Sequence, residues 1–194
     1  MSRVFLARAC QILHVVALSV WMGAVGMSGL VAAIVFPTMR ELDPTLGAYG
    51  GYEGDHALLG AGRIASKVFF SVDIIQFVCA SGALGTIVLL VVTGYSLNTL
   101  ARVFRVIVLC MTLALLSYHL LLFMPELQRL LNGYWEHAAQ GDTGTADQYK
   151  DRFLEFHGTA SRILGGLTLL VLINIVLACI TLTAKDKATD GGAK

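Results

Sequence analysis

Residues 9–39 read ACQILHVVALSVWMGAVGMSGLVAAIVFPTM, a run of 31 residues without Asp, Glu, Lys or Arg. About 20 apolar residues cross the hydrocarbon core of a bilayer as a helix, so this run can cross it with length to spare. Three more uncharged runs follow, over residues 74–101, 106–125 and 163–184. The sequence therefore predicts an all-α, integral membrane four-helix bundle. The expected spans are about 8–36, 67–96, 104–125 and 158–184.

The composition favours a membrane domain over a soluble one. Of the residues, 56% are hydrophobic and 14% are charged, whereas a soluble globular domain carries about 25% charged residues. So few charges cannot cover a surface in water, and we expect residues 1–185 to form a single four-span domain. The net charge of +1 does not indicate a nucleic-acid partner. The four cysteines lie in apolar segments without a CxxC pair, which indicates neither a zinc site nor a disulfide framework.

Charged residues at the helix ends predict the orientation. Four spans place both termini on one side of the membrane. If that side is the cytoplasm, the inner segments carry 7 basic and 2 acidic residues (+5), and the outer segments carry 7 basic and 11 acidic residues (−4), which sum to the +1 of the chain. The inner Lys and Arg lie in short segments at helix ends, where the positive-inside rule applies. We therefore expect a multi-pass protein of the cell membrane with both termini in the cytoplasm, including a short polar tail over 186–194.

The connections on the outer side are expected to be structured. Residues 37–65 are rich in Gly and Tyr, which favours a turn-rich loop that ends where Asp55 caps the helix of the second span. Residues 126–139 predict a short amphipathic helix at the membrane interface, because their large apolar residues share one face. These are Leu127, Leu130, Leu131, Tyr134 and Trp135. Thr145 and Gln148 form a capping-box pattern at the start of the last helix.

Ionisable residues within the spans are the main candidates for a functional site, because burying them in hydrocarbon costs free energy and they usually face the bundle interior. Asp73 follows Lys67 by six residues and His119 precedes Glu126 by seven, which places both about 10 Å below the outer surface. Arg162 enters the last span from the same side. We expect Asp73, His119 and Arg162 to form a cluster, either as an interhelical salt bridge or as a proton, metal or ligand site.

Two further histidines complete the candidate buried polar site. His14 lies about 9 Å beyond Arg8 along the first span and has no partner histidine on the inner side. His157 precedes Lys185 by 28 residues, about 42 Å along a helix that crosses about 30 Å of hydrocarbon, so we expect it above the outer boundary and out of register with His119. Because two haem ligands must lie at similar depth, we predict no haem, no metal site and no cofactor.

The order of several motifs resembles that of a known family. These motifs are His14, then Trp21-Met22-Gly23, then Phe36-Pro37 at the end of the first span, and later the segment FLEFHGTAS over 153–161. This order is similar to that of the transmembrane protein 205-like family, a four-span membrane domain of unknown function. Family members often carry an Asn shortly after the His-Gly-x-x-Ser pattern, where this chain has Arg-Ile-Leu-Gly over 162–165. The resemblance implies a four-span fold without an established activity. The pattern of His, Trp and Gly in the first span also resembles, more weakly, that of copper-resistance membrane proteins.

Three functions are compatible with the sequence. The favoured one is a non-enzymatic structural or interaction component in the lipid bilayer, alone, as a homo-oligomer or as a subunit of a larger membrane complex. It is favoured because no nucleophile, phosphate-binding loop or metal-ligand cluster is recognisable. The second is a small-solute or ion transporter, which would have to act as an oligomer because four spans are few. The third is a haem- or metal-binding membrane redox protein centred on His14 or His119.

Overall fold

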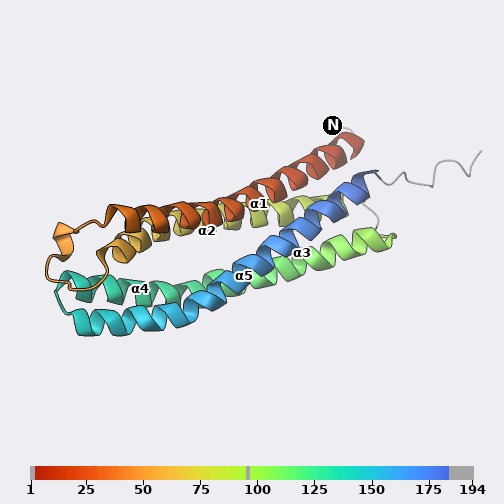
Figure 1. Cartoon of the computed structure of the whole chain (residues 1–194). Coiled ribbons are helices and arrows are strands. Elements are labelled where there is room, and N and C mark those ends of the chain that lie inside the picture. Colours follow the sequence, from red (N-terminus) through yellow and green to blue (C-terminus); the bar gives the residue numbers. More distant parts are fainter. Residues whose placement is uncertain (1–2, 95–96, 184–194) are drawn as a thin grey trace, which may run out of the picture.

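Long helices account for almost the whole chain (Figure 1). The computed structural model describes residues 3–94 and 97–183, which contain helices and no strand. In chain order these are α1 (Arg3–Leu42), the 3₁₀ helix η1 (Gly47–Tyr49), α2 (His56–Val92), α3 (Leu100–Tyr118), the π-helical segment η2 (His119–Phe123), α4 (Met124–Ala139) and α5 (Thr143–Thr183). Because α3, η2 and α4 follow one another without a break, these residues form four rods, each long and apolar enough to cross a membrane. The predicted all-α four-helix bundle is confirmed.

Both ends of the described chain lie at one end of the bundle, which we call the inner end. In Figure 1 the start of α1, the start of α3 and the end of α5 lie together on the right. The loop with η1 and the connection from α4 to α5 lie at the opposite, outer end. This up-and-down order is the usual one for rods joined by short connections. The predicted tail over 186–194 and the predicted end of the second span at 95–96 lie outside the described residues.

The rods are longer than a bilayer core is thick. α1 has 40 residues and α2 has 37, which gives about 55–60 Å at 1.5 Å per residue against about 30 Å of hydrocarbon. The first helix does not end at Phe36-Pro37, as the sequence predicts, but continues to Leu42. Its last turns pack closely on α2, since a Cβ at Gly60 would lie 2.5 Å from the Met39 methyl carbon. A packed neighbour of this kind stabilises a helix that continues through a proline.

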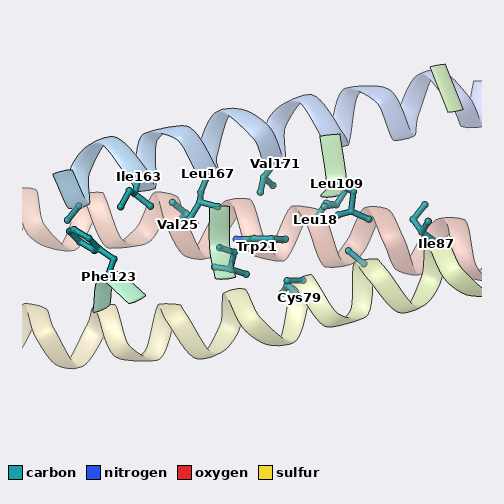
Figure 2. Packing of buried hydrophobic residues seen from close by; sticks show 14 of the residues in the cluster. Leu18, Trp21, Val25, Cys79, Ile87, Leu109, Phe123, Ile163, Leu167 and Val171 are labelled. Atoms are coloured by element: carbon teal, nitrogen blue, oxygen red, sulfur yellow. The ribbon is translucent and has the colours of Figure 1, made fainter. Parts of the chain in front are cut away.

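The core runs along the axis of the bundle, and Figure 2 shows its buried side chains pointing inward from all four rods. Labelled there are Leu18, Trp21, Val25, Cys79, Ile87, Leu109, Phe123, Ile163, Leu167 and Val171. Large hydrophobic residues also cover the outside of the bundle, for example Val20, which is 51% exposed, and Phe70, which is 61% exposed. An exterior this apolar indicates that the rods face lipid over much of their length.

A second buried cluster closes the outer end of the bundle. It comprises Tyr52, Leu59, Leu131, Tyr134, Trp135, Ala138 and Ala146. The predicted amphipathic helix is present as α4, and the five residues predicted to share its apolar face are all buried. It does not lie flat at the membrane interface, as we expected, but continues the rod of α3 and packs along α5 (Figure 1). This direction of α4 has a physical reason. The helix α5 begins at the same end of the bundle, and the apolar face of α4 is buried against it.

Aspartate side chains cap two helices at the outer end. As predicted, Asp55 caps α2, and its Oδ1 accepts a hydrogen bond from the Leu58 N–H at 2.7 Å. The capping box predicted at Thr145 is wrong, since α5 already begins at Thr143. There Asp142 Oδ1 accepts the hydrogen bond of the Thr145 N–H at 3.1 Å. Aspartate is a stronger N-cap than threonine, which explains why the helix starts earlier.

Gly141 is a position where we expect even a methyl group to destabilise the fold. Its φ is +76°, and a Cβ there would lie 3.2 Å from the Gly51 carbonyl oxygen. Gly141→Ala is expected to lower the free energy of unfolding by about 1–3 kcal/mol, from left-handed backbone strain and this contact. Gly144→Ala is the matched control, because its Cβ meets only Asp142 Oδ1 at 3.9 Å. Denaturant unfolding in detergent measures both variants, and equal stabilities would contradict the prediction.

Candidate functional site

Asp73 and His119 contact each other inside the outer half of the bundle. Asp73 lies on α2, and its Oδ1 accepts a hydrogen bond from His119 Nε2 at 3.1 Å. The side chain of His119 is 3% exposed and that of Asp73 is 13% exposed. The second ring nitrogen, His119 Nδ1, is buried without a hydrogen-bond partner in the part of the chain that the structure describes. Two of the three residues that the sequence places in one cluster therefore meet.

The π-helical segment η2 positions His119 and has a local cause in the sequence. Pro125 has no N–H to donate to the Leu121 carbonyl, and its ring would clash with that carbonyl in a regular α-helix. The turn widens instead, and the Met124 N–H donates to the His119 carbonyl, five residues earlier. His119 is stacked on Phe123, with ring centroids 6.3 Å apart. Such single π turns within long helices are frequent at functional sites.

A chain of hydrogen bonds with a defined direction holds the pair. Trp21 Nε1–H can only donate, and it donates to Gln76 Oε1 at 3.0 Å. The Gln76 amide nitrogen therefore faces Asp73 and donates to Oδ1 at 3.1 Å. A carboxylate oxygen accepts hydrogen bonds, so Gln76 and His119 Nε2 both donate to Asp73 Oδ1, and Asp73 Oδ2 is left free. Trp21 and Gln76 are fully buried but are not among the sequence-predicted site residues, although Gln76 follows Asp73 by one helical turn.

Arg162 does not join this pair. Its side chain is exposed on α5, and no hydrogen bond or ion pair connects it to Asp73 among the residues described. The core-facing positions of this turn belong to Ala160 and Ile163, which are buried. The expected cluster of three ionisable residues is therefore reduced to two.

The two remaining predicted site residues lie apart from the pair. His157 is exposed on the outer part of α5, with its ring 5.6 Å from that of Phe153. His14 is fully buried toward the inner end, where its Nδ1 lies 2.9 Å from Thr86 Oγ1 and 3.1 Å from the Ala83 carbonyl oxygen. Within residues 3–94 and 97–183, no three His, Cys, Asp or Glu side chains gather as a metal-binding group.

A cavity of about 430 Å³ extends from this pair toward the outer end. Residues of α1, α2, η2, α4 and α5 line it. Its inner end includes Val25, Asp73 and His119, and its outer end includes Leu58, Trp135 and Lys150. Between the two ends the wall is mainly apolar. His157 lines it as well, so three of the five predicted site residues border one space.

The polar groups of the wall differ between its two ends. Four serine and threonine side chains line the cavity, and each donates to a carbonyl of its own helix at 2.6–3.2 Å: Ser28, Ser66, Ser161 and Thr168. These hydroxyls therefore offer only acceptor oxygens to a ligand. At the outer end the wall carries donors: Trp135 Nε1 is buried without a described partner, and Lys150 Nζ is paired with Asp147 Oδ1 at 2.6 Å.

A tyrosine network closes the outer end beside Lys150. The Tyr52 hydroxyl donates to Asp147 Oδ1 at 3.1 Å and accepts from the Tyr134 hydroxyl at 3.2 Å. Burial raises the pKa of Tyr52, and so does the neighbouring charge of Asp147, which keeps the hydroxyl protonated as a donor. The network joins the outer loop to α4 and α5.

A second group of polar side chains, which sequence reasoning misses, is buried toward the inner end. Arg105 is 1% exposed, and its Nη1 donates to Gln11 Oε1 at 2.8 Å and to Thr181 Oγ1 at 3.0 Å. The charge count in the sequence assigns Arg105 to the inner loop. The one sign that its side chain is buried is its position, about one and a half turns after the start of α3.

The outer cavity is the best candidate for a functional site. It combines an apolar wall of ligand size with a buried carboxylate–imidazole pair at its inner end and hydrogen-bond donors at its outer end. Comparisons of the chain with protein-family models, with curated proteins and with solved structures found no match.

Proposed function

We propose that this chain is a multi-pass membrane protein without catalytic activity that binds a hydrophobic small molecule in the outer cavity, with the lipid bilayer as its surroundings. The cavity is the observation that supports this best. Its volume of about 430 Å³ falls within the roughly 300–1,000 Å³ of small-molecule sites. Such sites are mostly apolar with a few polar groups that orient the ligand, which describes the wall of this cavity.

Binding is favoured over a reaction by the arrangement of the hydroxyl groups. A Ser or Thr nucleophile needs its proton within hydrogen-bond reach of a general base. The serine and threonine hydroxyls of this wall instead donate to backbone carbonyls, as Ser28 does to Val25 at 2.6 Å. His119 Nδ1, the ring nitrogen that Asp73 leaves free, has no hydroxyl partner among the residues described.

Binding in the cavity can be followed through tryptophan fluorescence. The chain has two tryptophans; Trp135 lines the cavity, whereas Trp21 is fully buried elsewhere in the core. We expect methyl ω-bromohexadecanoate to quench Trp135 saturably in nanodiscs, because bromine quenches an indole that it contacts. Trp135→Phe should abolish the response.

Two glycines provide a matched pair of cavity variants. Gly62 lines the cavity and Gly26 does not, and a Cβ at either position would meet no atom within 4 Å. Gly62→Leu is expected to weaken binding by about tenfold or more, because its side chain occupies space that the ligand needs. Gly26→Leu should leave the affinity unchanged. Unaltered binding in Gly62→Leu, or no saturable quenching of the wild type, would remove the cavity as the binding site.

We further propose that both termini face the cytoplasm, which the positive-inside rule supports. Ala48 at the outer end and Thr99 at the inner end are both exposed, so each tolerates a reporter cysteine. In a background without the native cysteines, an impermeant thiol reagent added to intact cells is expected to label Ala48→Cys and not Thr99→Cys. The opposite labelling pattern would invert the orientation.

A relationship to the transmembrane protein 205-like family also remains our proposal. Its support is that motif residues have structural roles here. His14 and Trp21 are fully buried and each bonds to a side chain of α2, namely Thr86 and Gln76. These residues therefore help to hold α1 against α2.

A further inference from the structure

We infer that the inner end of the cavity binds the ammonium group of a lipophilic primary amine, whose hydrocarbon chain fills the rest of the cavity. The inference rests on the proposed function and adds the chemical class of the ligand. It follows from two properties of the inner end. Its free oxygen atoms accept hydrogen bonds, and its acidic side chain is that of Asp73.

The direction of the hydrogen-bond chain leaves acceptors at the inner end. Because Trp21 orients Gln76, and because Gln76 and His119 both donate to Asp73 Oδ1, the atoms left over are His119 Nδ1 and Asp73 Oδ2. Neither atom has a hydrogen-bond partner within the described ranges, and Nδ1 is buried. The Ser28 and Thr168 hydroxyls donate to their own helices, so they too can only accept from a ligand.

An ammonium group matches this arrangement. Asp73 Oδ2 borders an apolar wall, and a carboxylate oxygen left without a donor there costs free energy, which a ligand N–H recovers. A primary ammonium has three N–H donors and no acceptor, so its hydrogens can bond to the oxygens of Asp73, Ser28 and Thr168. A carboxylate or an ether would instead place a further acceptor beside the Asp73 carboxylate.

The charges around the cavity favour a cation at the same place. Apart from histidines and Tyr134, Asp73 and Lys150 are the ionisable residues in the described wall. Lys150 is bonded to Asp147 at the outer end, 18 residues and about 27 Å along α5 from Thr168. Within the described wall, a ligand ammonium at Asp73 therefore has no Lys or Arg side chain beside it. In apolar surroundings its charge-assisted hydrogen bond is about twice as strong as a neutral one.

The remainder of the wall accommodates the hydrocarbon chain. Outward from Asp73, Phe69, Leu127 and Phe153 line the cavity, and Trp135 lies near its outer end. An extended chain with its ammonium at Asp73 therefore directs its terminal carbon toward Trp135. A bromine on that carbon reports this orientation through quenching.

The test uses four ligands with the same ω-bromohexadecyl chain: the primary amine, its trimethylammonium analogue, the alcohol and the methyl ester. Quenching of Trp135 is measured in phosphatidylcholine nanodiscs, with Trp135→Phe as the background. We expect the amine to bind at least about tenfold more tightly than the alcohol, and more tightly than the trimethylammonium compound, which has the charge but no N–H. Asp73→Asn should reduce the affinity for the amine to about that for the alcohol.

The wild-type series separates this inference from the proposed function, even if Asp73→Asn does not fold. Equal affinities for the amine and the alcohol would overturn the inference and leave the binding of hydrophobic molecules standing. Trimethylammonium binding as tight as that of the amine would overturn the assignment of a primary amine. Saturable quenching by none of the four ligands would overturn the proposed function, and the inference with it.

Discussion

Replacing Asp73 and His119 together with leucine is expected to restore most of the stability that either single replacement removes. Each single variant leaves one partner of a buried pair without the other, which typically costs about 3–5 kcal/mol. The double variant removes both polar groups from apolar surroundings, so the two effects should not add. We expect a coupling energy of about 1–3 kcal/mol from the 3.1 Å contact between Nε2 and Oδ1.

The double-mutant cycle is measured by unfolding the protein in mixed micelles titrated with sodium dodecyl sulfate. Arg162 provides the matched control, since it is exposed on α5 and not bonded to Asp73. Asp73→Leu combined with Arg162→Leu should therefore give additive losses. Additivity for Asp73 with His119 as well would show that the hydrogen bond between them contributes nothing measurable.

The different outcomes for His119 and Arg162 show what depth along a helix can predict. Counting residues from the nearest surface charges places Asp73 and His119 at one depth, which the 1.5 Å rise sets, and Arg162 enters the last span from the same side. The rotation of a helix about its axis is not determined in this way when its residues are apolar nearly all round. His119 therefore faces Asp73, whereas Arg162 occupies a turn whose inward positions belong to Ala160 and Ile163.

The fold class follows from the sequence for a physical reason that does not extend to the helix ends. Long uncharged runs must be helices in lipid, because each backbone polar group needs a partner within the segment. Outside the hydrocarbon, tertiary contacts decide where each helix ends and in which direction it runs. The continuation of α1 past Pro37 depends on packing against α2, and the direction of α4 depends on α5, neither of which is contained in the local pattern.

The polar network around Arg105 illustrates the same limit. The positive-inside rule treats this residue as a charge at the cytoplasmic end of a span. In the structure its guanidinium is buried and donates to Gln11 of α1 and Thr181 of α5. Three helices must come together before either acceptor is near the guanidinium, so no spacing within one segment predicts these bonds.

Trp21→Ala is expected to cause the largest loss of stability of any single change considered. The indole is fully buried in the core between the rods (Figure 2), and replacing such a ring with alanine costs about 3–5 kcal/mol. The change also removes the donor to Gln76 Oε1, and a buried acceptor left unpaired costs about 1–3 kcal/mol more. Val20→Ala is the control on the same helix, because Val20 is 51% exposed and should change stability by less than about 0.5 kcal/mol.

Trp21→Phe separates the two contributions, because phenylalanine keeps most of the ring but has no N–H. Its loss should come mainly from the unpaired Gln76 Oε1 and amount to about 1–3 kcal/mol in the same unfolding titration. Gln76→Leu added to Trp21→Phe removes that unpaired oxygen but also the donor to Asp73 Oδ1. The double variant should therefore recover only part of the loss. Full recovery would mean that the bond from Gln76 to Asp73 does not support the pair, and that Trp21 acts on the site through packing alone.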